Sequence, residues 1–385
     1  MKIAILLPDT KVTGIFYYSK QLYQYITLQK EFITPIKYPN SYSFLYYLIS
    51  VIKSNANIFH IQLEPRFFKN PLEQVFMPIL AYIIKYLKRK KLIITLHAII
   101  NPKDIPLLLE DNKYGVFLKL FKPIIWYIYF MITKIILSIA DKIVVHNKLI
   151  HNYTISLFKI KNKKIEIIPH GTNLTIKNIK IEKANQLNLL YLGFLRPTRN
   201  ITCIIKALDI LQKDFPATIK LYLLFFIPKE RHSNKQISEM LSSLINISKN
   251  KSNIIILIDP KEEVIDQILN KIHIGILPYH ETTLESSGVA WRYAGLGIPF
   301  IGTNVPKLLG DFKFLDKHFL FSTFSPDKIA QAIKNLFYDK ELYDKISKQL
   351  ICIAINRSWD KIAKEYLRLY SEVSSHEGNS NNNTL

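Results

Sequence analysis

Short apolar runs alternate with helical patterns over the first 170 residues of the chain. The apolar runs fall at 2–7, 58–61, 91–96, 142–145 and 165–168. Between them, apolar residues recur at helical spacing over 15–25, 44–54, 72–90, 116–139 and 148–158. Continuous apolar runs suit strands that are buried on both faces. Their alternation with helices predicts a doubly wound parallel sheet.

A second series of the same kind follows a polar stretch, 175–186, which we interpret as an interdomain linker. Its strands are predicted over 187–192, 218–226, 253–258, 272–277 and 299–301. Its helices are predicted over 201–212, 326–337, 340–355 and 359–372, and 304–311 is predicted to be a loop at a strand end. Single cores stop growing at about 250–300 residues, and this chain has 385. The pattern therefore predicts two Rossmann-like domains, 1–177 and 187–355, and a Ser/Asn-rich disordered tail over 374–385.

The stretch 285–303 predicts an anion-binding site. A loop that contains Ser286 and Ser287 precedes a helical segment there, and a serine hydroxyl is a good cap for a helix N-terminus. Gly288 has no Cβ, so a ligand can approach the backbone closely. Free N–H groups and the helix dipole both favour negative charge at such a position. Five of the 11 glycines fall within 288–310, which favours this hypothesis over an ordinary strand–helix crossover.

Two arginines lie in a loop between a predicted strand and a predicted helix. They are Arg196 and Arg199, which follow the strand 187–192. Guanidinium groups match the geometry of phosphate oxygens, and ligands of open α/β sheets bind beyond the carboxyl ends of strands. We therefore favour a diphosphate-binding loop over two ordinary surface arginines. Gly14, after the first strand, is a candidate of the same kind but lacks a G-x-G-x-x-G context.

Four of the predicted strands have a histidine at or near their carboxyl end. These histidines are His60, His97, His146 and His170. One such histidine would be an ordinary loop residue, but four at the same sheet edge favour a ligand site. Their spacing matches no metal-binding motif, and the two cysteines of the chain form no C-x-x-C pair. We therefore expect neither a metal site nor a cofactor.

The formal net charge of the chain is +22 at pH 7. This excess predicts an anionic partner, which leaves nucleic acid, a membrane surface or a phosphorylated ligand. The sequence has no RRM, helix-turn-helix or zinc-finger pattern, so nucleic acid is not expected. The first apolar run is too short for a signal peptide and meets Pro8. With only two cysteines, these features favour a cytoplasmic location.

Two segments raise the question of a membrane. The amphipathic stretch 72–91 ends in Lys85 and the basic run 88–91, which indicates either contact with an anionic membrane surface or a solvated helix end. The apolar stretch 123–140 spans about 18 residues, the lower limit for crossing a bilayer, and it carries Lys134. We interpret it as a buried or interface-lying helix. The expected location is therefore cytoplasmic and peripheral to the inner membrane face.

Several pieces of the sequence resemble the retaining, nucleotide-sugar-dependent glycosyltransferases of family four, which have the GT-B fold. The pieces are Ile168-Pro169-His170-Gly171, the stretch 192–199, the stretch 285–303, Ser358-Trp359-Asp360-Lys361-Ile362-Ala363, and Ala140-Asp141-Lys142-Ile143-Val144-Val145-His146. They follow the order of the family over nearly the whole chain. The resemblance implies two Rossmann-like domains facing a cleft: an N-terminal acceptor domain and a C-terminal nucleotide-sugar domain. It also implies that the helix 358–373 crosses back onto the N-terminal domain.

The resemblance also implies roles for single residues. Glu285 matches the first glutamate of the family's E-x7-E motif, which faces the donor sugar, and His97 is similar to the histidine beside the reaction centre. These two are the predicted catalytic residues. The donor would be held by Gly14, Arg196, Arg199, Ser287, Gly288 and Val289. Tyr293 replaces the second glutamate, which usually holds the ribose, and Ala98 replaces a frequent aspartate, so the identity of the donor stays open.

By this resemblance the chain is expected to be a hexosyltransferase. It would move a sugar from a nucleotide-diphosphate donor to a hydroxyl of a glycan or lipid-linked acceptor, with retention and without a metal. The sequence has no D-x-D motif to hold a cation, which agrees with this expectation. Two alternatives remain: a GT-B phosphorylase or sugar-phosphate synthase, and a catalytically silent basic protein that binds membrane surfaces.

Overall fold

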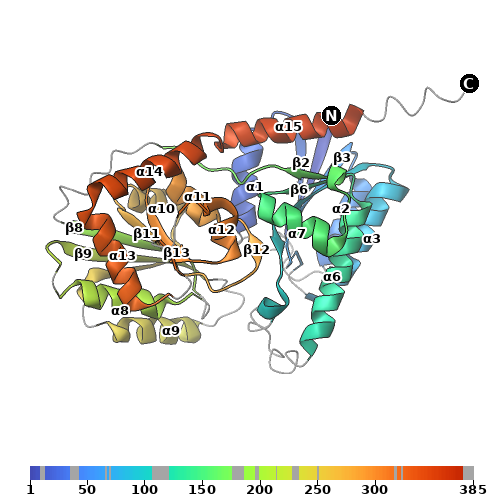
Figure 1. Ribbon diagram of the computed structural model, residues 1–385. Coiled ribbons are helices and arrows are strands. Elements are labelled where there is room, and N and C mark those ends of the chain that lie inside the picture. The colour runs from blue at the N-terminus through green and yellow to red at the C-terminus, as the bar shows by residue number, and fades with distance from the viewer. Residues whose placement is uncertain are drawn as a thin grey trace, which may run out of the picture. The chain divides into compact units, whose positions relative to one another are not determined.

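The computed structural model contains two compact α/β units (Figure 1). It describes residues 1–8, 14–34, 43–65, 67–68, 71–105, 121–175, 186–195, 199–213, 215–227, 234–248, 251–315, 319–321 and 324–375. Unit 1 comprises Met1–Gly171, Thr282–Ser286 and Trp359–Leu385, and unit 2 comprises Thr172–Glu281 and Ser287–Ser358. Most of the predicted linker, 176–185, lies outside the described residues.

Unit 1 is built on a six-stranded parallel sheet of order β2-β1-β3-β4-β6-β7. The strands are β1 (Lys2–Leu6), β2 (Gln29–Ile33), β3 (Ile58–Leu63), β4 (Lys91–Leu96), β6 (Lys142–Val145) and β7 (Ile165–Ile167). Every residue of the central strand β3 is buried, as expected for a strand covered on both faces. The edge strand β2 does not follow from the apolar pattern, because its sequence is mixed and mostly not buried.

Helices cover both faces of this sheet. On one face, α1 (Gly14–Gln24) packs against α15 (Trp359–Ser375). The other face carries α2 (Ser43–Lys53), α3 (Met77–Tyr82), α6 (Lys122–Ile139) and α7 (Lys148–Phe158). Alternate residues of β1 enter the two cores, Ile3 and Ile5 on the side of α15 and Ala4 and Leu6 on the side of α2.

Three predictions for unit 1 need correction. The single helix predicted over 72–90 is broken into a 3-10 helix (Pro71–Phe76), α3 and a π-helical turn (Ile83–Leu87). His60 lies inside β3 and not at its end. The predicted tail begins too early, because α15 continues to Ser375 and only 376–385 lie outside the described residues.

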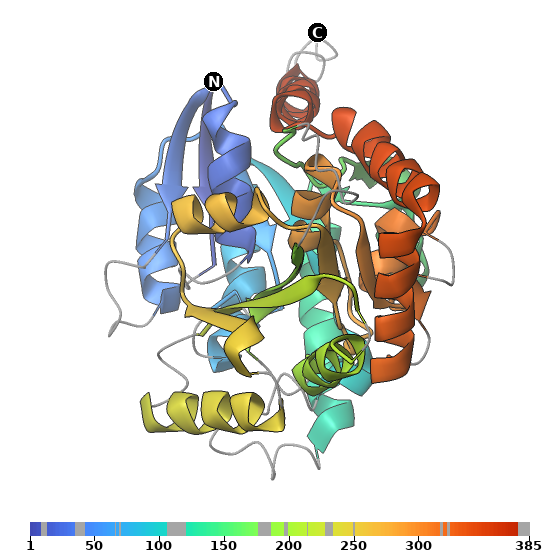
Figure 2. The ribbon, with the colours of Figure 1, turned by 90° about the vertical axis from the view of Figure 1, so that its left-hand side faces the viewer.

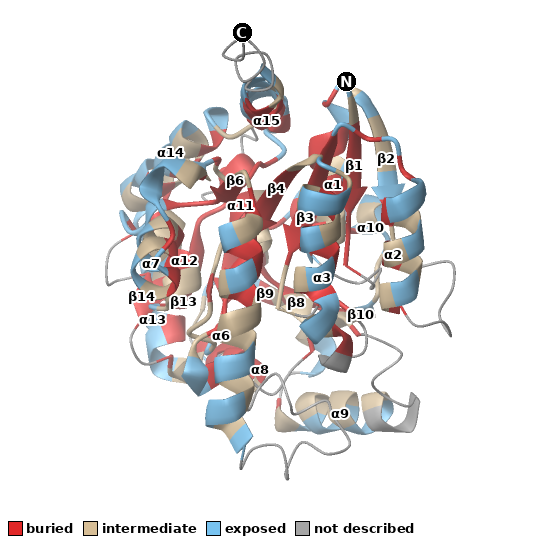
Figure 3. Ribbon diagram, turned by 90° about the vertical axis from the view of Figure 1, so that its right-hand side faces the viewer, coloured by how far each residue is buried: buried red, intermediate tan, exposed pale blue. Residues whose placement is uncertain are grey.

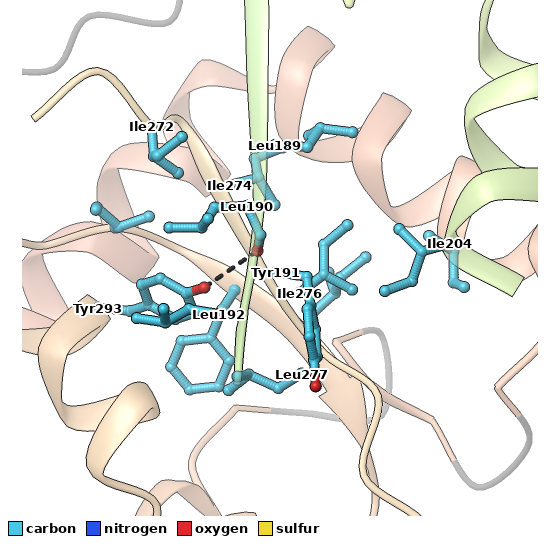
Figure 4. Packing of buried hydrophobic residues seen from close by; sticks show 14 of the residues in the cluster. Leu189, Leu190, Tyr191, Leu192, Ile204, Ile272, Ile274, Ile276, Leu277 and Tyr293 are labelled. Atoms are coloured by element: carbon cyan, nitrogen blue, oxygen red, sulfur yellow. Dashed lines mark hydrogen bonds between the residues drawn. The ribbon is translucent and has the colours of Figure 1, made fainter. Parts of the chain in front are cut away.

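Unit 2 repeats the plan with a sheet of order β10-β9-β8-β11-β13-β14. Its strands are β8 (Gln186–Phe194), β9 (Thr218–Phe226), β10 (Ile254–Ile258), β11 (Ile274–Leu277), β13 (Phe300–Thr303) and β14 (Leu320–Phe321). All neighbouring strands run parallel. Apolar side chains of β8 and β11 interleave at the centre of the core (Figure 4).

Figures 1 and 2 show how the helices of unit 2 are arranged. Seven α-helices are described in this unit. They are α8 (Ile201–Leu211), α9 (Asn234–Ile247), α10 (Glu262–Leu269), α11 (Gly288–Gly295), α12 (Pro306–Phe312), α13 (Pro326–Tyr338) and α14 (Lys340–Ile355). Helix α8 packs against α9 and α13, and α11 packs against α14. The loop predicted over 304–311 is wrong from Pro306 onward. Pro306 begins helix α12 there, because its fixed φ suits the first turn of a helix.

One further pair of short strands belongs to unit 1. β5 (Ala98–Ile99) pairs antiparallel with β12 (Leu284–Glu285). The second strand comes from a segment that is distant in sequence, so no local pattern predicts the pairing. Its consequence is that five residues from the second half of the chain, Thr282–Ser286, belong to unit 1.

Candidate functional site

His97 lies at the carboxyl end of β4, as predicted. Its backbone N–H donates to the carbonyl of Leu63 at 3.0 Å, and the residue is only 8% exposed. Its Nε2 lies 2.7 Å from Oε1 of Gln62, and its Nδ1 lies 3.2 Å from Nε2 of His146. Both ring nitrogens therefore have partners inside unit 1.

The surroundings of His97 keep its ring neutral at pH 7. Burial lowers the pKa of His97 well below its usual value, and three neighbouring histidines lower it further. We assign the remaining proton to Nε2, because the amide nitrogen of Gln62 donates to the hydroxyl of Tyr23 at 2.9 Å and only its oxygen faces His97. His97 would have to give up a contact with Gln62 or His146 before it could take a proton from a substrate. Its geometry therefore suits positioning better than general-base catalysis.

A buried network links strand β3 to helix α15. The hydroxyls of Tyr23 and Tyr370 lie 2.9 and 2.7 Å from Nδ1 of His60. Nε2 of His60 lies 2.8 Å from the hydroxyl of Thr95, which is 3.1 Å from that of Tyr366. Burial lowers the pKa of His60 to about 3 and raises that of Tyr366 to about 12. The network is therefore uncharged at neutral pH, and it holds α15 against the strands that carry the site.

Two of the sequence motifs meet in unit 1. A Cβ on Gly171 would collide with the ring of Trp359, so only glycine fits at this position. The ring centroids of His170 and Trp359 are 5.6 Å apart, and the ring of Tyr18 packs edge-on 5.1 Å from both. These motif residues fix the start of α15.

Glu285 lies next to the strand end that carries His97. In the pairing of β12 with β5, Glu285 is in register with Ala98, the residue after His97. Glu285 is half-buried. The structure therefore brings together, within one unit, the two residues that the sequence resemblance marks as catalytic.

Side chains fix the segment before Glu285 to unit 1. The hydroxyl of Thr283 donates to the carboxylate of Asp104 at 2.8 Å, and that of Thr282 donates to the same carboxylate at 3.2 Å. Asp104 is buried, and Leu284 is buried in the apolar core. The backbone of Glu285 is thus held by hydrogen bonds and by packing.

Ser287 caps the first helix that follows in unit 2. Its hydroxyl oxygen accepts a hydrogen bond from the N–H of Ala290 at 3.2 Å, as predicted for an N-cap, and lies 2.9 Å from the hydroxyl of Tyr279. Gly288 is the first residue of α11, and the half-buried Val289 packs against the core of unit 2. The first N–H groups of a helix have no partner within it, so this terminus is suited to an anion.

Two cations gather at the ring of Tyr279. The guanidinium carbon of Arg199 lies 4.4 Å from the ring centroid, and Nζ of Lys307 lies 4.7 Å from it. Arg199 also forms an ion pair with Glu281 at 2.6 Å, in which the two side chains are 6% and 12% exposed. A bound phosphate would therefore compete with Glu281 for Arg199.

Tyr293 is part of the core of unit 2. Its hydroxyl donates to the carbonyl of Leu190 at 3.1 Å (Figure 4), and its ring fills the space that a Cβ on Gly275 would need. Tyr293 is fully buried, and burial raises the pKa of its hydroxyl well above the usual value. The residue at the position of the family's second glutamate therefore serves packing in this chain.

The structure says less about the remaining predicted site residues, Arg196 and Gly14. Arg196 lies outside the described residues. Gly14 begins α1, and an added Cβ there would meet nothing within 4 Å, so the space beside it is open. Within the described ranges, no group of three or more His, Cys, Asp or Glu side chains is placed to hold a metal ion.

Sequence analysis missed several residues of these clusters. Tyr279 and Glu281 follow β11, and Lys307 lies just beyond β13, so the rule that ligand sites form at strand ends could have found them. Gln62 is a polar residue in a largely apolar strand, and its contact with His97 depends on the register of β3 and β4. No sequence pattern marks Asp104 as part of these clusters.

No protein-family model and no curated protein matches the sequence. Solved structures do match it. Anabaena Alr3699/HepE in complex with UDP-glucose gives a TM-score of 0.68 over 97% of this chain and 100% of that chain, at 13% identity. Sucrose-phosphate synthase from Thermosynechococcus elongatus gives 0.69 over 98% and 100%, at 15% identity. A glycosyltransferase from Rickettsia africae ESF-5 gives 0.63 over 97% and 98%, at 16% identity.

At these identities the likeness concerns the fold. The chain has the GT-B fold, with two parallel-sheet α/β units, which confirms the predicted fold class.

Proposed function

We propose that this chain is a glycosyltransferase that moves a sugar from a nucleotide-diphosphate donor to an acceptor hydroxyl, with retention of anomeric configuration. The observation that carries the proposal is the start of α11, where the N-terminus capped by Ser287 joins the cation cluster through Tyr279. The shared GT-B fold supports it, because two solved structures of that fold carry UDP or UDP-glucose.

In this proposal, unit 2 binds the diphosphate. The free N–H groups of α11 and the cations Arg199 and Lys307 offset the negative charge that builds up on the leaving phosphate. Gly288 and Val289 would contact the donor through their backbone, and Arg196 would add a second guanidinium. These groups can stabilise the leaving group without a metal ion.

Unit 1 would carry the groups that act on the sugar. Glu285 would face the donor sugar, and His97 would limit the orientation of that sugar. Only Ser286 separates Glu285 from Ser287 in the sequence, so the Cα atoms of Glu285 and Ser287 lie within about 7 Å of each other. The acceptor would be a glycan or a lipid-linked sugar, used at the cytoplasmic face of the membrane.

Release of nucleoside diphosphate tests the proposal. The purified full chain is mixed with a panel of UDP-, GDP- and ADP-sugars, and binders are first selected by the rise in melting temperature that a native-state ligand produces. Donor turnover with candidate acceptors is then measured, and the anomeric proton coupling of the product reports retention. If no donor both binds and is turned over, the proposal is wrong.

The choice of variants depends on the ion pair between Arg199 and Glu281. Replacing Arg199 alone would leave the buried carboxylate of Glu281 without its partner, which destabilises proteins in its own right. The double change Arg199→Gln with Glu281→Gln removes both charges and keeps hydrogen-bonding groups in place. It should weaken donor binding, as should Arg196→Ala, whereas Lys313→Ala, an exposed lysine of the same unit, should not. Wild-type turnover in both the double variant and Arg196→Ala would contradict the assigned diphosphate site.

The same assay separates the alternatives. A GT-B phosphorylase would consume inorganic phosphate, and a sugar-phosphate synthase would use a sugar phosphate as acceptor. A catalytically silent membrane-binding protein would show neither activity while still binding vesicles.

A further inference from the structure

Three neighbouring helical segments of unit 1 are apolar on the side that faces away from the core. On α2, the exposed residues Leu45, Ile49 and Ile52 recur at the spacing of one helix face. These residues oppose the buried Tyr47 and Val51. A helix that is apolar all round is expected in a protein core or in contact with lipid.

The next segment repeats the pattern. From the 3-10 helix to the π-helical turn, Val75, Ile79, Tyr82 and Tyr86 are exposed at spacings of three and four residues. Leu87 at its end is 67% exposed. Helix α3 contacts both α2 and α6, so this stripe lies between the other two (Figure 3).

Helix α6 presents a third exposed apolar face. Ile124 and Tyr127 are 56% and 57% exposed, and Ile128 and Ile135 are also exposed. Among the described residues, α6 is the one helix long and apolar enough to cross a membrane, yet only 17% of it is buried. Its buried residues, including Ile136, lie in its C-terminal half. Of the two alternatives predicted for 123–140, a buried or an interface-lying helix, burial therefore does not apply to most of its length.

Burial of that C-terminal half argues for a helix that lies on a membrane rather than one that spans it. Ile136 and Leu137 are fully or almost fully buried in the core beside the sheet. A spanning helix would have to remove them from this core. The N-terminal half can meet lipid without any change in the fold.

The charged residues within α2, α3, the π-helical turn and α6 are all basic, and Glu73 of the preceding 3-10 helix is buried. α2, α3 with the π-helical turn, and α6 contain no Asp or Glu. Lysines and an arginine flank the apolar stripes: Lys53, Arg89, Lys90, Lys91, Lys122 and Lys134. Apolar and aromatic residues bordered by basic ones match the chemistry of an anionic lipid surface.

Two further basic residues, Lys88 and Lys85, make contacts within the fold, so we do not include them in the charge that faces a membrane. Nζ of Lys88 donates to the carbonyls of Ile52 and Ser54 at 2.6 and 2.9 Å, so it ties the ends of two segments together. Lys85 forms an ion pair with Asp141. In the predicted basic run 88–91, Lys88 therefore stabilises the fold, and Arg89, Lys90 and Lys91 contribute the surface charge.

We infer that the outward stripes of α2, of the segment 75–87 and of α6, together the three-helix face, dock unit 1 on an anionic phospholipid membrane. Pairing with a second copy of the chain is disfavoured, because it would bring two clusters of lysines together in an apolar contact. The inference does not depend on the proposed enzymatic activity.

Vesicle binding tests it. The full chain is sedimented with vesicles of phosphatidylcholine containing about 30% phosphatidylglycerol, and with vesicles of phosphatidylcholine alone. The double variant Ile124→Glu with Tyr127→Glu places two charges on the most exposed part of the face, near the helix N-terminus where carboxylates are tolerated. We expect its partition coefficient to fall at least about 10-fold. The wild type should lose binding to a similar extent in neutral vesicles, or when salt is raised from about 0.05 to about 0.5 M.

Tyr338→Glu is the matched control. Tyr338 is 61% exposed, at the end of a helix in unit 2, and its replacement should leave vesicle binding unchanged. Equal binding of the double variant and the wild type would overturn the inference. So would a wild-type dimer that the double variant converts to a monomer, because the face would then be an interface between copies. Donor turnover measured without vesicles reports separately on the proposed function.

Discussion

The two units share one architecture but differ in the residues that their helices turn outward. In unit 2, α13 buries Ile329, Ile333 and Leu336 and turns residues such as Lys328 and Gln331 outward. In unit 1, α6 is apolar on both sides. Packing on a sheet requires only one apolar stripe per helix. The second stripe of α6 is not needed for packing on the sheet, and under the inference above it would contact lipid.

The candidate sites of the two units differ as well. Unit 1 surrounds His97 with buried histidine and tyrosine side chains, whereas unit 2 places Arg199 and Lys307 near a helix N-terminus. Under the proposed function, the first arrangement would affect the rate of the chemical step and the second the binding of the donor. Substitutions that separate kcat from KM can therefore break or sharpen this contrast.

The largest effect is expected at Glu285. Glu285→Gln keeps the size and the strand pairing but removes the charge that would face the donor sugar. We expect kcat to fall by about 10³-fold, within the usual range for a positioned acid or base, with little change in the KM for the donor. Steady-state kinetics with varied donor measures both. Glu263→Gln, on the exposed side of α10, is the control. A rise in KM with unchanged kcat would instead place Glu285 among the binding residues.

Acid should destabilise unit 1 more than unit 2. The folded-state pKa of His60 is about 3, below the usual value near 6.5 for an unfolded chain, so the unfolded state binds more protons as the pH falls below about 6.5. Between pH 7 and pH 5 this group alone should cost about 2 kcal/mol of stability. Burial lowers the pKa of His97 with the same sign, and in unit 2 it lowers that of His273.

Hydrogen exchange of peptides from β3 and β8, in urea at both pH values, measures the two units separately. The pH dependence of β3 should become smaller in His60→Asn, which cannot take up a proton in this range. Equal loss of protection in both units, or none in unit 1, would refute the contrast.

A smaller effect is expected at Lys307. Lys307→Gln removes one cation from the ring of Tyr279 and should raise the dissociation constant of the donor about 10-fold, the equivalent of about 1.4 kcal/mol. Titration calorimetry with the donor found in the screen measures it. Lys313→Gln serves as the exposed control in the same unit. Unchanged affinity would remove Lys307 from the site.

The sequence predicts most of the strands of the two sheets, but it does not predict how the residues of the site come together. Strands such as β4 and β6 follow directly from their apolar runs, because buried parallel strands need little else. The contact of Glu285 with Ala98 joins strands of two residues each, which are too short to show a period. Only the resemblance to a family pointed to Glu285 and His97 as partners.

Local patterns also fail where two faces of one helix carry similar residues. The stretch 72–90 has an apolar stripe on each side, so its helical spacing does not tell which stripe enters the core. Tyr293 shows the same limit in another form. Its position in a motif suggested the ligand site, but packing over Gly275 places it inside the core.

Tyr293→Phe should have the smallest effect of those considered. It removes the hydrogen bond to the carbonyl of Leu190 and leaves the ring in place, which should cost about 1 kcal/mol of stability. Tyr343→Phe, whose buried hydroxyl donates to the carbonyl of His273 at 2.9 Å, should cost a similar amount. Both variants should keep the kcat and donor KM of the wild type. A selective rise in donor KM for Tyr293→Phe would mean that this hydroxyl senses the nucleotide, and the contrast between a binding surface and a packing core in unit 2 would then fail at this residue.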